Sequence, residues 1–250
     1  KRGVSHALSK RLIPIAYRAA SSVIAVSEGV RAELISIQPR LLGKIEVLPT
    51  PVLTSEMRRQ GEERPPHRWF DDSGVPIIVS AARLERHKGI IELIRAFAVV
   101  RRSRQGRLII IGEGEARREL ESEVMRLGLR ADVDLPGFQP NPFSFMNRAA
   151  LFVLNSHYEG LPNVLVQAMA FGTPVVSTDC KSGPSEILEG GRLGRLIPVG
   201  SHDHLVEAIQ DSLGLPKHRE AQESAWRRFG AEKATSAYLA CAGLPEMPPA

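Results

Sequence analysis

Residues 150–178 read ALFVLNSHYEGLPNVLVQAMAFGTPVVST, which is an apolar run, a polar turn, a helix-length stretch and a second apolar run. Ala150–Leu154 and Pro174–Thr178 have the length and composition of buried strands, and Val164–Phe171 has those of a buried helix. A strand, a helix and a strand in this order form a βαβ unit, whose two strands lie parallel. This stretch therefore predicts an α/β fold with a parallel sheet.

The same alternation extends over the chain from residue 76 onward. Further strands are predicted at Pro76–Ala81, Arg107–Gly112, Asp132–Leu135 and Gly194–Ile197. Further helices are predicted at Ile90–Arg104, Ala116–Leu127, Pro142–Arg148, Pro184–Glu189, His204–Leu213, Lys217–Phe229 and Ala231–Ala240. Together these elements predict one doubly wound parallel sheet of six strands.

A smaller unit precedes this sheet. Ser22–Val26 and Lys44–Leu48 are predicted to be strands, and Ser27 is predicted to cap a helix over Glu28–Ile35. Thr54–Gly74 is rich in Arg, Glu, Pro and Gln, which predicts a linker or long loop between the two parts.

Length and composition are those of an ordinary globular protein. The 250 residues are 43% hydrophobic and 24% charged, and no apolar run reaches the about 18 residues of a membrane-spanning helix. Cys180 and Cys241 lack the spacing of a disulfide framework or a zinc site, so we expect a reducing, cytoplasmic compartment. The chain starts at Lys1 without the apolar segment of a signal peptide, so we expect it to be a piece of a longer chain.

Positive charge is concentrated near the N-terminus. Residues 1–70 carry 12 Lys and Arg against 6 Asp and Glu, whereas the remaining residues carry 21 against 22. Only 5% of the residues are aromatic and no zinc-finger or RNP-like segment occurs, so we expect no nucleic-acid partner. Attraction to an anionic lipid acceptor or membrane explains the charge better, and predicts peripheral contact with the inner membrane face.

The turns that follow the strands are the candidate ligand site, because open parallel sheets bind ligands outside the carboxyl ends of their strands. After the first strand of the sheet, Arg83 and Lys88 precede an apolar helix and could bind a diphosphate, although read alone they are equally typical of solvated loop charges. In the turn Ser156–Asn163, the Glu159 carboxylate and the helix N–H groups behind it can hold a polyol and an anion. A lone Glu there is more often a helix-dipole residue, but the two loops together favour a ligand site.

Other motifs exclude several enzyme classes. The turn Gly112-Glu113-Gly114 has Arg117 where a dinucleotide fingerprint has its third glycine, which argues against NAD binding. Neither a P-loop nor a G-x-S-x-G nucleophile elbow occurs. The turn Pro136–Gln139 is as typical of an ordinary corner as of a base-binding loop.

Taken together, these segments resemble glycosyltransferase family 4, whose members are retaining nucleotide-sugar enzymes with the GT-B fold of two Rossmann-like domains. The resemblance spans roughly residues 20–240. It is carried by Ile24–Ser27, Val47–Val52, Arg83-Leu84, Lys88-Gly89, Gly112–Gly114, Pro136-Gly137, Glu159–Asn163 and Gly172–Val176.

The resemblance implies four segments. Residues 1–53 would be the tail of the N-terminal acceptor domain, 54–74 a linker or loop, 75–228 the nucleotide-sugar donor-binding domain, and 229–250 the C-terminal crossover helix and tail. The expected fold is therefore one Rossmann-like half of a GT-B protein with a remnant of the other half.

The resemblance also implies roles for residues at matching positions. Arg83 and Lys88 would neutralise the leaving diphosphate and Glu159 would contact the sugar, so these three are the expected catalytic residues. Thr50 departs from the usual Asn, and Gln167 replaces the second Glu of the E-x(7)-E motif, which binds the ribose. The expected donor-binding residues are Gly112, Glu113, Gly114, Phe138, Gln139, Gly160, Leu161, Pro162, Asn163, Val164, Leu165 and Gln167.

The resemblance implies a hexosyl- or N-acetylhexosaminyl-transferase. In such an enzyme the acceptor hydroxyl attacks the sugar from the face that the diphosphate leaves, so the anomeric configuration is retained. Thr178–Leu188 looks like relatives that use UDP-sugars, and the acceptor would be lipid-linked or a polysaccharide, as in lipopolysaccharide synthesis. We expect no cofactor and no essential metal, because cations serve the diphosphate. We expect the fragment alone to be inactive.

Two other functions remain open. A non-catalytic nucleotide-sugar-binding module is the main alternative. A third hypothesis, an NAD-dependent oxidoreductase, rests on fold analogy alone.

Overall fold

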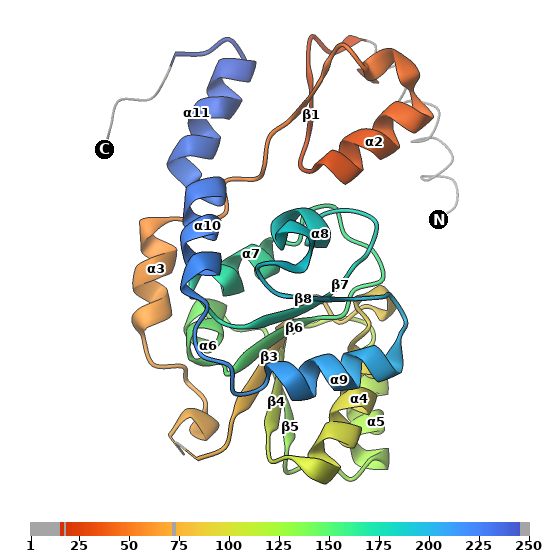
Figure 1. The fold of residues 1–250 in the computed structure, drawn as a ribbon, viewed down its shortest axis with the longest axis vertical. Helices are drawn as coiled ribbons and strands as arrows, with labels where there is room; N and C mark the ends of the chain where they lie inside the picture. Colours follow the sequence, from red (N-terminus) through yellow and green to blue (C-terminus); the bar gives the residue numbers. More distant parts are fainter. Residues whose placement is uncertain (1–15, 18, 72–73, 246–250) are drawn as a thin grey trace.

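A six-stranded parallel sheet forms the larger part of the chain (Figure 1). The structure is a computed structural model that describes residues 16–17, 19–71 and 74–245. The strand order is β5-β4-β3-β6-β7-β8, so the winding direction reverses between β3 and β6 and the predicted doubly wound sheet is confirmed. The strands are β3 (Ile77–Ala81), β4 (Arg107–Ile111), β5 (Val133–Gly137), β6 (Leu151–Leu154), β7 (Val175–Thr178) and β8 (Arg195–Ile197).

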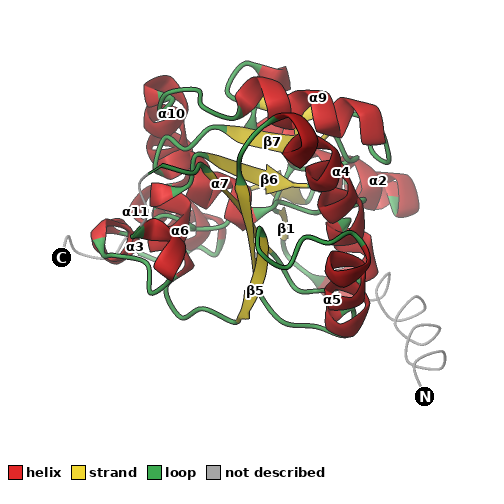
Figure 2. Ribbon diagram, turned by 90° about the horizontal axis from the view of Figure 1, so that it is seen from below, coloured by secondary structure: helices red, strands yellow, loops and turns green. Residues whose placement is uncertain are grey.

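Helices cover both faces of this sheet (Figure 2). On one face, α4 (Ile90–Ser103), α5 (Arg117–Arg126) and α9 (His202–Ser212) bury one set of alternate strand residues. On the other face, α6 (Pro142–Arg148), α7 (Asn163–Ala170) and α10 (Arg219–Phe229) bury the other set. Because both faces are buried, the strands read as continuous apolar runs.

The structure corrects the prediction of a linker or long loop over Thr54–Gly74. Helix α3 (Ser55–Glu62) is capped by Thr54, whose Oγ1 accepts a hydrogen bond from Met57 N at 3.1 Å. Met57 and Trp69 are buried in the core of the sheet domain. The charged composition describes only the solvent face of this segment, where Arg59 pairs with Glu56 and Glu63, so the buried contacts were overlooked.

A two-stranded parallel sheet precedes α3. Its strands β1 (Val23–Ala25) and β2 (Ile45–Val47) pair directly and flank α2 (Glu28–Ile37). We call residues 19–48 the N-terminal unit; it has a small core of its own. Ser27 caps α2 as predicted, and the helix ends two residues later than expected. Residues 1–15 and 18 of the expected acceptor-domain tail lie outside the described residues.

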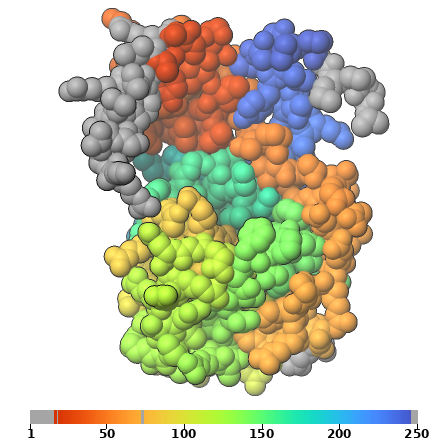
Figure 3. Space-filling model, turned by 180° about the vertical axis from the view of Figure 1, so that it is seen from behind, coloured from red at the N-terminus to blue at the C-terminus, as the bar shows by residue number. Residues whose placement is uncertain are grey.

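Helix α11 (Ala231–Cys241) follows α10 and runs beside the N-terminal unit. Its Tyr238 hydroxyl donates a hydrogen bond to Leu48 O at 3.2 Å, and Leu53 forms a parallel bridge with Gly230. Figure 3 shows the unit and α11 side by side above the sheet domain. This final helix therefore connects the sheet domain back to the first part of the chain. Among the described residues, no helix is long and apolar enough to cross a membrane.

Candidate functional site

The loops after β3 and β6 meet where the strand order reverses. Asn155 Nδ2 donates a hydrogen bond to Gly89 O at 2.8 Å, and His157 N donates one to His87 O at 2.8 Å. Gly89 has a φ of 62°, and a Cβ at this position would lie 2.0 Å from Asn155 O. Only glycine therefore allows the two loops to approach this closely.

This approach brings Lys88 and Glu159 together. Lys88 Nζ lies 2.8 Å from Glu159 Oε1, and the two side chains are only 14% and 12% exposed. Ser156 Oγ donates a further hydrogen bond to the same Oε1 at 2.7 Å. Two residues predicted to act on one ligand thus form a largely buried ion pair.

Arg83 lies apart from this pair. Its side chain is 73% exposed and forms an ion pair with Glu85 on the same loop. No contact joins it to Lys88 or Glu159 within the described part of the chain. Its guanidinium is therefore exposed to solvent and paired within its own loop.

The turn after β4 packs against the turn after β3. Leu84 N donates a hydrogen bond to Glu113 O at 2.9 Å. Added Cβ atoms at Gly112 and Gly114 would lie 1.9 Å from Ala82 O and 2.4 Å from Leu84 O. The glycines that the sequence analysis assigned to ligand approach thus already have a structural reason, which is the contact between two turns.

The turn after β5 completes this edge of the sheet. Phe138 is 73% exposed, and Gln139 Nε2 donates a hydrogen bond to Pro136 O at 3.0 Å. Gly137 has a φ of 80°, and a Cβ at this position would lie 2.8 Å from Glu113 Oε1. The predicted base-side residues therefore lie beside the turn after β4.

The N-terminus of α7 borders the site behind Glu159. The first N–H groups of a helix, here those of Asn163 and Val164, lack intrahelical partners. The N-cap residue, Pro162, has no side-chain acceptor that could replace them. Leu165 N already donates to Pro162 O at 2.9 Å. Gln167 lies one turn into the helix with its side chain partly exposed. The helix start thus presents backbone donors four residues after Glu159 in the chain.

Cys180 is a neighbour of the site that the sequence analysis did not place there. It is almost fully buried, and burial followed by the charge of Glu159 raises the pKa of its thiol. The thiol therefore stays protonated and contributes a small apolar wall rather than a nucleophile.

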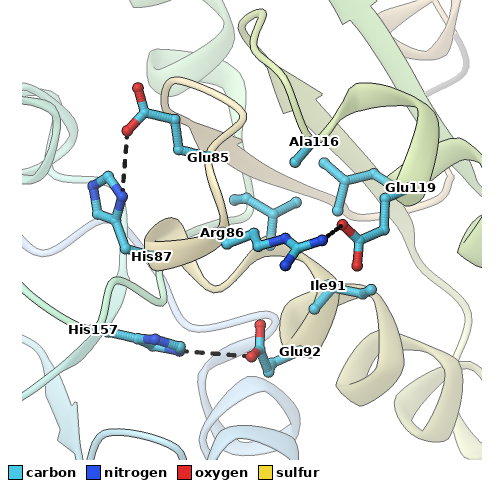
Figure 4. Close-up of a pocket in the computed structure, with 10 residues that line it drawn as sticks. Glu85, Arg86, His87, Ile91, Glu92, Ala116, Glu119 and His157 are labelled. Atoms are coloured by element: carbon cyan, nitrogen blue, oxygen red, sulfur yellow. Dashed lines mark ion pairs between the residues drawn. The ribbon is translucent and has the colours of Figure 1, made fainter. Parts of the chain in front are cut away.

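A cavity of about 350 Å³ lies next to the site, between the starts of α4 and α5 (Figure 4). His157 Nε2 faces Glu92 Oε1 at 3.6 Å, and His87 Nδ1 faces Glu85 Oε2 at 3.3 Å. Arg83, Lys88 and Glu159 do not line this cavity. Nothing in the sequence pattern indicated a role for its two histidines, although His87 directly precedes Lys88 and His157 lies two residues before Glu159.

A second cavity, of about 380 Å³, lies between the N-terminal unit, the sheet domain and α11. Ser27, Leu161, Glu186 and Lys233 are among the residues that line it. In the described ranges, no group of three or more His, Cys, Asp or Glu side chains is arranged to hold a metal ion.

Comparison with known protein families gives one family match. The family model for glycosyl transferases group 1 matches residues 62–229, which is more than half of the chain. The match includes the loops after β3, β4, β5 and β6 and helix α7.

Two curated proteins are similar in sequence. An uncharacterized glycosyltransferase of Methanocaldococcus jannaschii is 42% identical over 120 residues, which are 48% of this chain and 29% of that protein. N-acetylgalactosamine-N,N'-diacetylbacillosaminyl-diphospho-undecaprenol 4-alpha-N-acetylgalactosaminyltransferase of Campylobacter jejuni is 30% identical over 227 residues, 90% of this chain and 59% of that protein. The chain thus spans less than two thirds of either relative.

Solved structures share the fold. HepE of Anabaena, in complex with UDP and glucose, matches with a TM-score of 0.80 and 23% identity over 94% of this chain and 67% of that chain. The predicted α/β architecture of one GT-B half is confirmed by this likeness.

Proposed function

The chain belongs to the glycosyl transferases group 1 family, and we propose that it is the donor-binding part of a retaining glycosyltransferase. The observation that carries the proposal is the 2.8 Å contact between Lys88 and Glu159. It lies at the reversal point of the sheet, where open α/β folds bind their ligands. A cation and a carboxylate there suit a ligand that has a diphosphate and sugar hydroxyls.

In this proposal, the donor diphosphate binds between Lys88, Arg83 and the N-terminus of α7. The Arg83 guanidinium exchanges Glu85 for a phosphate, and the backbone donors of Asn163 and Val164 add partial positive charge. Glu159 accepts a hydrogen bond from a sugar hydroxyl. Phe138, Gln139 and the turn Gly112–Gly114 flank the base.

The transfer step follows from this arrangement. The bond between the anomeric carbon and the diphosphate oxygen breaks, and its electron pair goes to the diphosphate. The acceptor oxygen bonds to the anomeric carbon from the same face, and its proton passes to the departing oxygen. Preorganised positive charge at the diphosphate stabilises the charge that develops there, which is usually the largest contribution of an enzyme.

The donor class that we favour is a UDP-sugar, with a hexose or an N-acetylhexosamine. The segment Thr178–Leu188 supports this choice, and Gln167 replaces the usual ribose-binding Glu with a neutral hydrogen-bonding group. The name of the Campylobacter jejuni relative describes a diphospho-undecaprenol acceptor, which supports a lipid-linked acceptor here. A polysaccharide acceptor is the second option that we propose to test.

The N-terminal unit fits the proposed organisation as the tail of an acceptor domain. The unit lies above the sheet domain in Figure 1, and α11 crosses back to it. We further propose that the protein works in the cytoplasm, peripherally at the inner membrane face. The basic excess of residues 1–70 supports attraction to anionic lipid.

The experiment is a calorimetric titration of the chain with UDP, GDP, UDP-glucose, UDP-N-acetylglucosamine and GDP-mannose, followed by transfer assays with the full-length chain. We expect one nucleotide class to bind and its sugar to be transferred to a lipid-linked acceptor with retained configuration. Absence of binding to every nucleotide would contradict the donor-binding proposal. Binding without any turnover by the full-length chain would instead favour the non-catalytic binding module.

A further inference from the structure

The N-terminal unit forms a hydrogen bond to the loop that carries Glu159. Ser27 Oγ donates a hydrogen bond at 2.9 Å to the carbonyl oxygen of Gly160, the residue after Glu159. Ser27 Oγ also accepts a hydrogen bond from Val30 N at 3.2 Å, and this bond caps α2. The side chain that starts α2 therefore also contacts the candidate sugar site.

A carboxylate from the sheet domain completes the start of α2. Glu186, in the short helix α8 (Pro184–Ile187), accepts a hydrogen bond from Glu28 N on Oε2 at 2.8 Å. Its Oε1 accepts one from Gly29 N at 2.9 Å. The first N–H groups of a helix lack intrahelical partners and carry partial positive charge, so a carboxylate binds them well. Glu186 thus caps a helix 157 residues earlier in the chain.

The segment that carries Glu186 is itself held from two sides. Arg228 Nη2 donates to Glu186 O at 2.6 Å and Nη1 donates to Ile187 O at 3.1 Å, which ties α8 to α10. On the opposite side, a Cβ on Gly183 would lie 2.5 Å from Pro162 Cδ and 2.9 Å from Gly160 O. The backbone of this segment therefore touches the Glu159 loop directly.

The contact with α2 is equally close. A Cβ on Gly29 would lie 2.6 Å from Ser182 Oγ, so helix α2 approaches the segment before Glu186 without room for a side chain. Figure 1 shows α8 between α2 and α7. We call the hydrogen bonds of Ser27 and Glu186 across this interface the α2 clasp.

We propose that Glu186 is a positioning residue for sugar transfer, which fixes the N-terminal unit against the Glu159 loop through the α2 clasp. This inference rests on the proposed function, in which the acceptor is held on the side of the N-terminal unit. Transfer needs the acceptor oxygen in line with the anomeric carbon, and small displacements of either partner slow it strongly. Glu186 acts on that alignment without touching the donor.

The test compares Glu186→Gln with Glu33→Gln. The glutamine keeps the size of the side chain but presents an NH₂ group to one of two N–H donors. Glu33 is the matched control, because it pairs with Lys181 across the same interface at 3.8 Å and is solvent-exposed, so its removal costs little.

Two readouts are needed. The first is amide hydrogen exchange of Glu28 and Gly29 in the 250-residue chain, which reports the clasp itself. We expect exchange to rise at least about tenfold in Glu186→Gln, the factor for one charged hydrogen bond, and to stay unchanged in Glu33→Gln. The second readout is the kcat and donor KM of the full-length chain, where we expect kcat to fall about tenfold or more at nearly constant KM.

The outcomes separate this inference from the proposed function. Unchanged exchange, or a raised donor KM at unchanged kcat, would overturn the positioning role of Glu186. Failure of the unmodified chain to bind any nucleotide would overturn the proposed function, and the exchange measurement would still report whether the clasp exists. Recovery of kcat in Glu186→Asp, which restores a carboxylate, would support the inference further.

Discussion

Lys88 Nζ and Glu159 Oε1 lie 2.8 Å apart although 71 residues separate them in the chain. Parallel strands β3 and β6 bring them together, because both residues follow the carboxyl ends of adjacent strands. A bound diphosphate would share the Lys88 ammonium with Glu159. Removing Lys88 would leave a largely buried carboxylate unpaired and reduce stability as well as binding. Arg83, which is exposed, therefore gives the cleaner test of phosphate binding.

Arg83→Ala should weaken binding of the cognate nucleoside diphosphate by about 1.5–3 kcal/mol, the range for hydrogen bonds to charged groups. Its free energy of unfolding should stay within about 0.5 kcal/mol of that of the unmodified protein, as for other exposed positions. Arg86→Ala is the control, because Arg86 is on the same loop but pairs with Glu119 at the neighbouring cavity. Calorimetric titration measures both. Equal losses in the two variants would point to a general effect of charge and against a phosphate contact.

Gln167→Ala should weaken nucleotide binding by about 1 kcal/mol if this side chain holds the ribose. Gln167→Glu should retain or improve affinity, because a carboxylate is a stronger acceptor for ribose hydroxyls. Gln222→Ala, which removes an exposed glutamine from α10, controls for loss of a helical side chain. If Gln167→Ala binds as tightly as the unmodified chain, the ribose has no contact with this residue.

Gly89→Ala should damage both stability and nucleotide affinity. Its Cβ would lie 2.0 Å from Asn155 O, so the loops that carry Lys88 and Glu159 must separate. Gly128→Ala is a matched control, since Gly128 has a similar φ of 70° but no atom within 4 Å of the added Cβ. We expect a cost of about 1–2 kcal/mol for the control, due to strain alone, and a clearly larger loss for Gly89→Ala. Urea unfolding that shows equal losses would contradict the close approach.

Glu123 makes the stability of the protein depend on pH. Hydrogen bonds from Arg126 and Arg95 lower the pKa of this carboxyl from its usual 4.5 to about 2. Its stabilising contribution is therefore complete above about pH 4.5 and is lost as the pH falls toward 2. Glu123→Gln should destabilise the protein at pH 7 by about 1–3 kcal/mol, and the difference should shrink below pH 4.5. Glu121→Gln, at an exposed pair with Arg117, should change little at either pH.

The sheet was predictable because its strands are buried on both faces and read as apolar runs. The end of β5 was not: Pro136 and Gly137 argue against a strand, yet β5 continues through both. The reason is that β5 lies at the edge of the sheet, where the missing N–H of a proline need not face a partner. Helix α3 was missed because its few buried residues, Met57 and Gly61, lie among charged ones.

The location of the site was predictable, but its contacts were not. Strand ends identify the loops, whereas the loop after β3 contains Arg83, Arg86 and Lys88, and only the packing at Gly89 selects Lys88 as the partner of Glu159. The capping role of Glu186 could not be predicted, because the helix that it caps lies 157 residues away in the chain. Local patterns define elements, and long-range contacts of this kind depend on how the elements pack.

The central claim is that a nucleoside diphosphate binds at the carboxyl ends of β3 and β6. Amide chemical-shift mapping of the ¹⁵N-labelled chain during titration with UDP, and with GDP in parallel, tests it most directly. We predict that the largest shifts fall on Lys88, Gly112, Gly160 and the first residues of α7, and that they saturate with the nucleotide. Shifts confined to the cavity between α4 and α5, or none with either nucleotide, would contradict the account.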